Sequence, residues 1–363
     1  FSLNFFLSIK SLINKINLLT IKKDFLIYIY ILILSLYFLL SLSPLTSADV
    51  LDYHAGTALN ILRFDKYLLL PEWFTSLQSG VGEVLIALGF SIGSEQFGSL
   101  VQFTSIISFS GIIFKFFKNK KLFDSNYFII LTVLTCPILI FLLSGNKPQI
   151  FFSSLIFFAL SLNFVKYKND DQRLKNYIII NLFICCAVMG KFSFGLSGFI
   201  VWFFSTINLV NKKNFKVMIV IPFVIFIIFF LPYLIWKFQN LGGNILQYMF
   251  SPFPLHLPGY ENFLNHNKGS QEIPFPNFLF YTSLSRATEF LGFNSLLLIL
   301  IIFYFKNDIR VLKILLIILA FVIISNIYAS PSARYYLDPI LWTTLGISFL
   351  KKNKLHSKTK GYT

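Results

Sequence analysis

A series of long apolar blocks constrains the fold of this chain more than any other feature. Blocks rich in Phe, Ile and Leu recur with lengths of about 18 to 21 residues, which an α-helix needs to cross a hydrocarbon core of about 30 Å. Only 13% of the 363 residues are charged, whereas a water-soluble surface normally requires about a quarter. The blocks lack the alternation of apolar and polar residues that membrane β-strands have. The sequence therefore predicts an all-α integral membrane protein.

Apolar blocks bounded by charged or turn residues predict about ten transmembrane helices. Their approximate ranges are 25–45, 97–117, 126–144, 149–165, 177–190, 193–210, 217–236, 291–305, 311–329 and 337–350. The last block is short, and residues 81–93 are apolar enough for a re-entrant or surface helix, so we expect between about nine and eleven spans. We find no internal repeat and no low-complexity linker, and we treat residues 1–363 as a single membrane domain.

The distribution of basic residues predicts the orientation. If the N-terminus is cytoplasmic, 23 of the 31 Lys and Arg residues fall on the cytoplasmic side, in short loops where the positive-inside rule is most reliable. Of the 15 acidic residues, 10 fall on the other side. We therefore expect a multi-pass inner-membrane protein with both termini in the cytoplasm. Residues 1–24 lack the charged, apolar and small-residue regions of a cleavable signal peptide.

Two segments on the predicted periplasmic side, about 46–96 and 237–290, are much longer than the cytoplasmic loops. Long segments in a compact protein usually carry binding or catalysis. The first has the apolar spacing of amphipathic surface helices, for example at Leu59, Leu62 and Phe64. The second is rich in aromatic residues and proline, which suits an ordered lid over a cavity. We therefore expect the functional site on this side.

The composition also argues against two kinds of site. The net charge of +16 comes from basic residues that flank apolar blocks rather than cluster on one solvated domain, so we predict membrane lipids and no nucleic acid as partners. Cys136, Cys185 and Cys186 all lie inside predicted spans, which supports neither a disulfide framework nor a zinc site.

The densest group of polar residues follows the first span and reads SADVLDYH over residues 47–54. The carboxylates of Asp49 and Asp52 and the imidazole of His54 make a candidate general base or cation site. If the segment is helical, Asp49, Asp52 and Tyr53 share one face. Desolvation beside lipid shifts the pKa of a carboxylate, which can keep a base ready near neutral pH. The alternative is helix capping, because Ser and Asp commonly begin helices.

The order of these features resembles the polytopic glycosyltransferases of fold type C, which use polyprenyl-phosphate-linked sugars and include the dolichyl-phosphate-mannose-protein mannosyltransferases. The resemblance rests on a first span followed at once by an Asp-x-x-x-Tyr-His element at 49–54, and on a long outer segment with surface helices. It also rests on the lysine in MGKFS (189–193) and on the Arg-Tyr pair in ARYYLDP (333–339). The pattern touches most of the chain.

The resemblance implies that the aspartate after the first span activates the acceptor or helps to hold a divalent cation such as Mg²⁺ or Mn²⁺. It matches Asp49, and Asp52 is an additional carboxylate, so both are candidate catalytic residues and Asp49 is the candidate metal ligand. Tyr53, His54, Glu83 and Tyr335 are candidate substrate-binding residues. Glu83 resembles a glutamate that follows the surface helices in the family, and its burial in an apolar stretch would require a partner.

The implied chemistry is inversion at the anomeric carbon of the sugar, with a lipid phosphate as the leaving group. This chemistry needs a base for the acceptor hydroxyl and cations for the charge that develops on the phosphate. Lys147, Lys191 and Arg334, which precedes Tyr335, stand at predicted outer ends of spans and are the candidate substrate-binding cations. Snorkelling of the two lysines to lipid headgroups is the alternative.

The sequence thus favours a hexosyl- or pentosyltransferase of the cell envelope. It would move a sugar from a polyprenyl-phosphate donor to a lipid or glycan acceptor on the periplasmic side, as in polysaccharide biosynthesis. A transporter or flippase is the alternative from another class, and it would place ionisable groups near the bilayer midplane. An O-antigen polymerase or ligase is a third reading, but such enzymes usually carry arginines in their large outer loops, where this chain has only Arg63 and Arg286.

Overall fold

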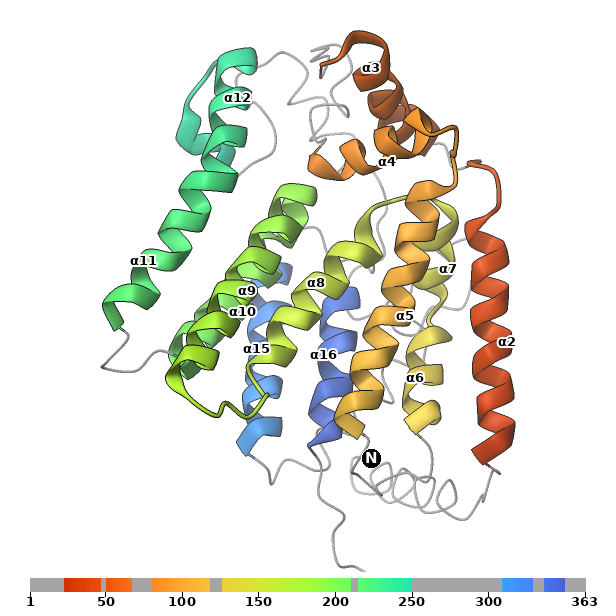
Figure 1. Ribbon diagram of the computed structural model, residues 1–363, viewed down its shortest axis with the longest axis vertical. Helices are drawn as coiled ribbons and strands as arrows, with labels where there is room; N and C mark the ends of the chain where they lie inside the picture. Colours follow the sequence, from red (N-terminus) through yellow and green to blue (C-terminus); the bar gives the residue numbers. More distant parts are fainter. Residues whose placement is uncertain are drawn as a thin grey trace, which may run out of the picture.

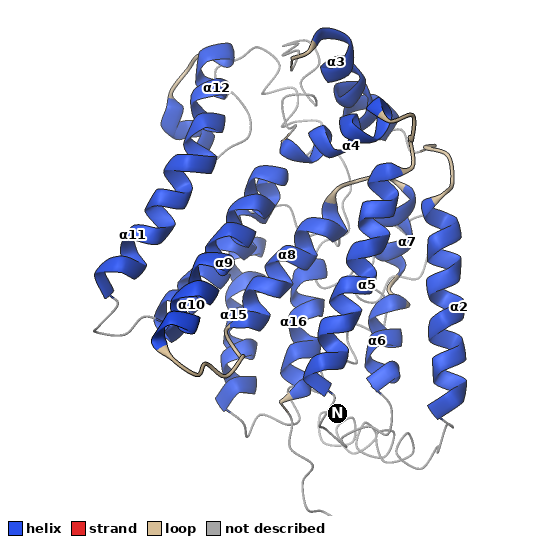
Figure 2. Cartoon of the chain, in the orientation of Figure 1, coloured by secondary structure: helices blue, strands red, loops and turns tan. Residues whose placement is uncertain are grey.

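The computed structural model describes residues 23–46, 50–66, 80–117, 126–209, 215–249, 309–328 and 336–349. Within these ranges all regular structure is helical and there are no strands, which confirms the all-α prediction (Figure 2). The longer helices run side by side as a bundle, and two short helices, α3 (Gly56–Phe64) and α4 (Val81–Ser91), lie at one end of it (Figure 1).

The helices of the bundle follow the apolar blocks of the sequence. The long ones are α2 (Lys23–Ser41), α5 (Phe97–Phe117), α8 (Gln149–Leu162), α9 (Asp170–Gly190), α10 (Gly195–Leu209), α15 (Ile309–Tyr328) and α16 (Leu337–Ser348). The others are the pair α6 (Asn126–Leu134) and α7 (Pro137–Ser144) and the run of α11 (Phe215–Ile225), η4 (Phe226–Phe230) and α12 (Leu231–Leu241). Three short helical turns are η1 (Val50–Ala55), η3 (Phe192–Phe194) and η5 (Ile245–Met249).

Four of the described helical segments are long and apolar enough to cross a membrane. They are Phe97–Phe116, Asp170–Gly190, Phe192–Leu209 and Phe215–Asn240, and the bent pair Tyr127–Leu134 and Pro137–Ser144 makes a fifth if it is one span. Phe25–Ser41 and Gln149–Leu162 are apolar but shorter, and the predicted span 291–305 lies outside the described residues. The chain is therefore a multi-pass membrane protein, and the total of about ten spans stays a prediction.

The block expected to form one span over 126–144 is two helices. α6 and α7 meet at an angle of 62°. Pro137 begins α7, and a proline has no N–H to donate and disfavours helical backbone in the residue before it. Cys136 accordingly has extended backbone, with φ −68° and ψ 121°. One proline inside the apolar block thus accounts for the bend.

α8 is the central helix of the described bundle, because it packs against α5, α9, α10 and α16. It buries Gln149 in its first turn and mainly Phe, Ile and Leu side chains further on. α2 and α11 instead expose many Leu, Ile, Val and Phe side chains, which suits helices that face lipid. The polar side chain of Gln149 is therefore enclosed by protein close to one end of the bundle.

The two ends of the bundle differ in their charged residues. At one end, which we call the site end, the starts of α4 and α8 meet the end of α9. At the opposite end, Nζ of Lys313 on α15 donates a hydrogen bond of 3.1 Å to Oδ1 of Asn208 near the end of α10. The helix ends and the connection between α8 and α9 at that opposite end also carry Lys115, Lys166, Lys168, Arg173, Lys175, Lys216 and Arg310.

The two predicted outer segments are described only in part. In 46–96, the described residues form η1, α3 and α4, and Leu59, Leu62 and Phe64 of α3 are exposed, as expected for a surface helix. In 237–290, α12 continues to Leu241, beyond the predicted end of its span at residue 236. The extra turn of α12 places Lys237 within a helix rather than in a loop.

Candidate functional site

Close backbone packing holds three elements together at the site end. A Cβ on Gly80, the N-cap of α4, would lie 2.6 Å from the carbonyl oxygen of Met189 and 2.8 Å from that of Gly190. A Cβ on Gly82 would lie 2.7 Å from Cγ of Pro148. Real Cβ atoms essentially never approach so closely, so both positions require glycine. These contacts fix the start of α4 against the end of α9 and against the segment that leads into α8.

Glu83 provides the buried carboxylate of the site, with 3% of its surface exposed. Its Oε1 lies 2.7 Å from Nδ1 of His54 on η1, and its Oε2 accepts a hydrogen bond of 2.7 Å from the backbone N–H of Gly80. The second contact caps α4, whose N-terminal end favours a negative charge. The partner that the sequence required for a buried Glu83 is thus supplied by η1 and by the N-cap of α4.

The surroundings of His54 favour the neutral imidazole, in which one ring nitrogen can still accept a hydrogen bond. It is buried, and its ring lies against that of Tyr53, with 4.1 Å between the ring centres. Burial lowers the pKa of His54 below its ordinary value; Glu83 opposes this shift, and the positive charges of Lys191 and Lys147 add to it. Because a carboxylate only accepts hydrogen bonds, the neutral ring donates from Nδ1 to Glu83. Nε2 is then an acceptor, and it has no partner among the described residues.

Lys191 and Lys147 approach this pair from two further elements. Lys191 is the C-cap of α9, and its Nζ donates a hydrogen bond of 2.9 Å to Oε1 of Gln149. Lys147 lies between α7 and α8 with 0% of its surface exposed, and its Nζ is 4.3 Å from the centre of the Phe141 ring. An ammonium that snorkels must reach headgroups at the surface, so snorkelling does not describe the enclosed Lys147.

The turn before α8 is built to hold Lys147 inside. Asn146 has φ 48°, a left-handed conformation that asparagine tolerates better than most residues. Its Nδ2 donates a hydrogen bond of 3.3 Å to the carbonyl oxygen of Glu95, and Gly98 leaves room for its side chain. The turn is therefore tied to the segment before α5, and the following residue, Lys147, is directed into the protein.

Lys237 is a buried lysine outside the set of site residues predicted from the sequence. It lies in the last helical turns of α12, only 1% of its surface is exposed, and its Nζ is 5.2 Å from the centre of the Tyr233 ring. The charge of Glu83 acts on both Lys237 and Tyr233. The available signal was a lysine in a stretch that continues an apolar span, which is costly unless the ammonium faces polar groups.

The remaining predicted site residues divide into two groups. Asp52 is exposed and Tyr53 is half-buried, both on η1 next to His54. Asp49, Arg334 and Tyr335 lie outside the described residues. The structure therefore brings together His54, Glu83, Lys147 and Lys191 of the predicted set.

A divalent cation finds no complete set of protein ligands in the described part of the chain. No group of three or more His, Cys, Asp and Glu side chains is close enough there to hold a metal ion. Glu83 and His54 already bind each other through Oε1 and Nδ1. Mg²⁺ or Mn²⁺ at Asp49 thus stays a prediction.

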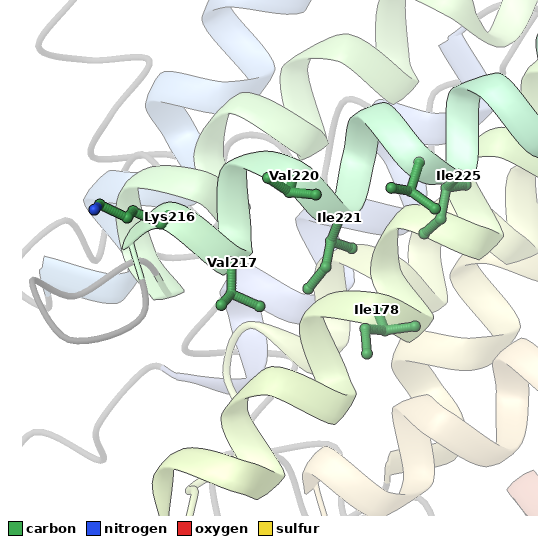
Figure 3. Close-up of a pocket in the computed structure, with 7 residues that line it drawn as sticks. Ile178, Lys216, Val217, Val220, Ile221 and Ile225 are labelled. Carbon is green, nitrogen blue, oxygen red and sulfur yellow. The ribbon is translucent and has the colours of Figure 1, made fainter.

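One groove in the described part of the chain lies away from these residues. It is a shallow apolar groove of about 440 Å³ between α9 and α11 (Figure 3). Its lining is Ile178, Lys216, Val217, Val220, Ile221, Val224 and Ile225. None of the site residues contributes to it, and its lining is aliphatic apart from Lys216.

A solved structure and a family model match this chain. Among solved structures, the chain is similar to ArnT from Cupriavidus metallidurans in its crystal structure bound to undecaprenyl phosphate, with a TM-score of 0.59 and 10% sequence identity. The match covers 90% of this chain and 59% of the ArnT chain, so the chain spans less than two thirds of that protein. This likeness shows the fold and supports the fold of type C.

A comparison with curated proteins gives no match. A family model described as the DUF1420 N-terminal domain matches residues 1–360, and the chain therefore belongs to this family.

Proposed function

We propose that this chain is a glycosyltransferase of the inner membrane that transfers a sugar from a polyprenyl-phosphate-linked donor to a lipid or glycan acceptor on the periplasmic side. One observation carries the proposal. The buried His54 is held by Glu83 and lies within reach of the charges of Lys147 and Lys191, all at one end of a membrane helix bundle. The bound undecaprenyl phosphate of the structurally similar ArnT supports a polyprenyl phosphate as the lipid carrier.

The lysines suit the leaving group of such a reaction. When the bond between the sugar and the phosphate breaks, the electron pair stays on the phosphate oxygen, and negative charge develops there. Lys147 is enclosed by protein and Lys191 is half-buried, so their charges act with little screening by water. Arg334 and Tyr335 belong to the proposed phosphate-binding set through the sequence resemblance alone.

The acceptor side of the proposed reaction needs a base. Asp49 is the proposed base, with Asp52 as the second carboxylate, and Asp49 directly precedes η1 in the sequence. A divalent cation, if used, would be held at Asp49. Tyr53 and His54 follow on η1, where Nε2 of His54 can accept a hydrogen bond from a substrate hydroxyl.

The sidedness of charge supports a periplasmic site. The described helix termini opposite the site end carry many lysines and arginines, and basic residues are retained on the cytoplasmic side of membrane proteins. The site end then faces the periplasm. A transporter or flippase would instead place its ionisable groups near the bilayer midplane.

A complementation experiment tests the proposal. A strain deleted for this gene is expected to lose one sugar from a surface glycan or lipid, seen by mass spectrometry, and the wild-type gene restores it. Asp49→Asn should fail to restore the sugar although the protein still inserts in the membrane. Asp65→Asn is the matched control, since Asp65 is an exposed aspartate of the same outer segment whose left-handed backbone asparagine tolerates.

Two results would contradict the proposal. Full restoration by an Asp49→Ala, Asp52→Ala double variant would exclude both proposed bases. Movement of a polyprenyl-phosphate sugar across liposome membranes by the purified protein, with no acceptor present, would favour a flippase.

A further inference from the structure

The groove between α9 and α11 has the length of the hydrocarbon region of one bilayer leaflet. Both helices belong to segments that are long and apolar enough to cross a membrane, Asp170–Gly190 and Phe215–Asn240. The aliphatic lining on α11 runs from Val217 to Ile225, which at 1.5 Å per residue is about 12 Å. Half of a hydrocarbon core of about 30 Å is about 15 Å. The groove therefore suits a chain that stays within one leaflet.

The chemical character of the groove changes along its length. Lys216 lies at one end, and its ammonium points away from the aliphatic side chains that line the rest (Figure 3). This end of the groove belongs to the first turn of α11, at the end of the bundle opposite the site end (Figure 1). An acyl chain joined to a phosphate has the same order of apolar and polar parts.

A polar pocket follows the groove along α9. It has a volume of about 350 Å³, and its lining is Lys168, Asn169, Asp171, Gln172 and Lys175. Lys175 stands three residues before Ile178, which lines the apolar groove, so the two side chains share one face of α9. Along this face, the surface thus passes from polar to aliphatic within one helical turn.

Positive charge exceeds negative charge at this place. The described residues that line the pocket and the groove include Lys168, Lys175 and Lys216, against one acid, Asp171. All three lysines are exposed, and within the described residues none of them forms an ion pair. Basic pockets between membrane helices bind anionic headgroups, whereas a zwitterionic headgroup brings a cation of its own. The electrostatics therefore favour a lipid with net negative charge.

We propose that the groove between α9 and α11 binds one acyl chain of an anionic phospholipid, such as phosphatidylglycerol, with the headgroup phosphate at Lys216 and Lys175. A polyprenyl phosphate offers a similar phosphate, but its chain is far longer than the groove. The bound chain covers the aliphatic side chains between α11 and α9, the helix against which α11 packs. None of the residues of the candidate functional site takes part, so this inference does not rest on the proposed function.

The charge is tested by competition between two lipids. Purified full-length protein in detergent micelles is mixed with equal amounts of phosphatidylglycerol and phosphatidylethanolamine that have identical acyl chains, and native mass spectrometry measures the ratio bound. The wild-type protein should prefer phosphatidylglycerol. Lys216→Gln should lower the ratio about fivefold, or about 1 kcal/mol for one lysine near a headgroup. Lys115→Gln removes an exposed lysine from the last turn of α5, at the same end, and should leave the ratio unchanged.

The groove itself is tested by filling it. Val220→Trp places a large side chain in the groove and should weaken the binding of both phospholipids. Ile219→Trp is the matched control, because Ile219 is an exposed neighbour on α11 that does not line the groove.

Four results would overturn the inference, and none of them bears on the proposed function. The first is a wild-type protein that binds the two phospholipids equally. The second is an equal loss of preference in Lys216→Gln and Lys115→Gln, which would mean attraction by the basic surface as a whole. The third is unchanged binding in Val220→Trp, which would place the lipid elsewhere. The fourth is displacement of phosphatidylglycerol by an equal amount of undecaprenyl phosphate, which would identify a polyprenyl lipid as the occupant.

Discussion

The two ends of the helix bundle both carry lysines, but they hold them in different ways. At the site end, Lys147 and Lys237 expose 0% and 1% of their surfaces. At the opposite end, Lys216 is exposed, and Lys313 is half-buried with a hydrogen bond to Asn208. An exposed ammonium keeps its hydration or meets headgroups, whereas an enclosed one must be stabilised by protein or by a ligand.

This difference separates two meanings of basic residues in a membrane protein. Cations at the opposite end suit the positive-inside rule, which concerns orientation and asks nothing of side-chain packing. At the site end, Lys147 and Lys237 are instead enclosed by protein, and each ammonium lies over an aromatic ring. Burial, rather than number, therefore marks the end at which we propose that the site lies. Matched changes at the two ends test this difference.

Loss of the buried carboxylate should have the largest effect. Glu83→Ala leaves His54 and the N–H of Gly80 without their acceptor and the nearby ammonium groups without their counter-charge, so it should cost about 3–5 kcal/mol of unfolding free energy. Asp170→Ala removes an exposed acid from the first turn of α9 at the opposite end and should cost less than about 1 kcal/mol. Denaturant unfolding in detergent micelles measures both. Equal costs would show that the carboxylate of Glu83 is not stabilised by its buried partners.

Removal of a site-end ammonium should reduce transfer without unfolding the protein. Lys147→Met keeps the length of the side chain and removes its charge, and the rate of sugar incorporation should fall about 30- to 100-fold, or about 2–3 kcal/mol in transition-state stabilisation. Lys313→Met is the matched change at the opposite end and should alter the rate less than about threefold. The rate is followed by mass spectrometry of the glycan over time. Similar losses in the two variants would mean that Lys147 acts on folding and not on the phosphate.

Backbone packing provides a smaller contrast. Gly80→Ala would press a methyl group against the carbonyl oxygens of Met189 and Gly190, which belong to helical backbone and cannot move freely, at a cost of about 1–3 kcal/mol. Gly111 in α5 has no atom within 4 Å of an added Cβ, and Gly111→Ala should stabilise the helix by about 0.5–1 kcal/mol. Thermal unfolding midpoints should therefore move in opposite directions. A stabilised Gly80→Ala variant would disprove the close contact between α4 and α9.

Much of the helical bundle could be predicted from the sequence because lipid imposes a length and a composition on each span. The blocks at 97–117 and 193–210 became α5 and α10, and each boundary agrees within a few residues. The bend at Pro137 was not anticipated, although the proline that causes it was visible in the sequence. Side-chain periodicity gives the extent of a block and not whether its backbone stays straight.

The site was harder to predict because its contacts join distant segments. The need of Glu83 for a partner followed from its apolar surroundings, but the choice of His54, 29 residues earlier, depends on how η1 and α4 pack. Lys237 was missed because a lysine at the end of a span has the same local sequence whether it snorkels or is enclosed. The packing of α12 decides whether this lysine snorkels or is enclosed, and the pattern of apolar residues does not predict that packing.

The protonation of His54 should give the smallest effect, and its sign is decisive. Burial lowers the pKa of His54, Glu83 opposes the shift, and the charges of Lys191 and Lys147 add to it. The unfolded chain has a histidine pKa of about 6.5, so below that pH the unfolded state takes up a proton that the folded state resists. The contribution of His54 is therefore complete above about pH 6.5 and is lost as the pH falls toward its folded pKa.

His54→Asn retains an N–H that can donate to Glu83 but does not titrate, so the wild-type protein should lose more stability than this variant between pH 7.5 and 5. A wild-type protein that instead gains stability relative to the variant over this range would mean that His54 is a protonated partner of Glu83, and Nε2 would then be a donor rather than an acceptor for a substrate hydroxyl.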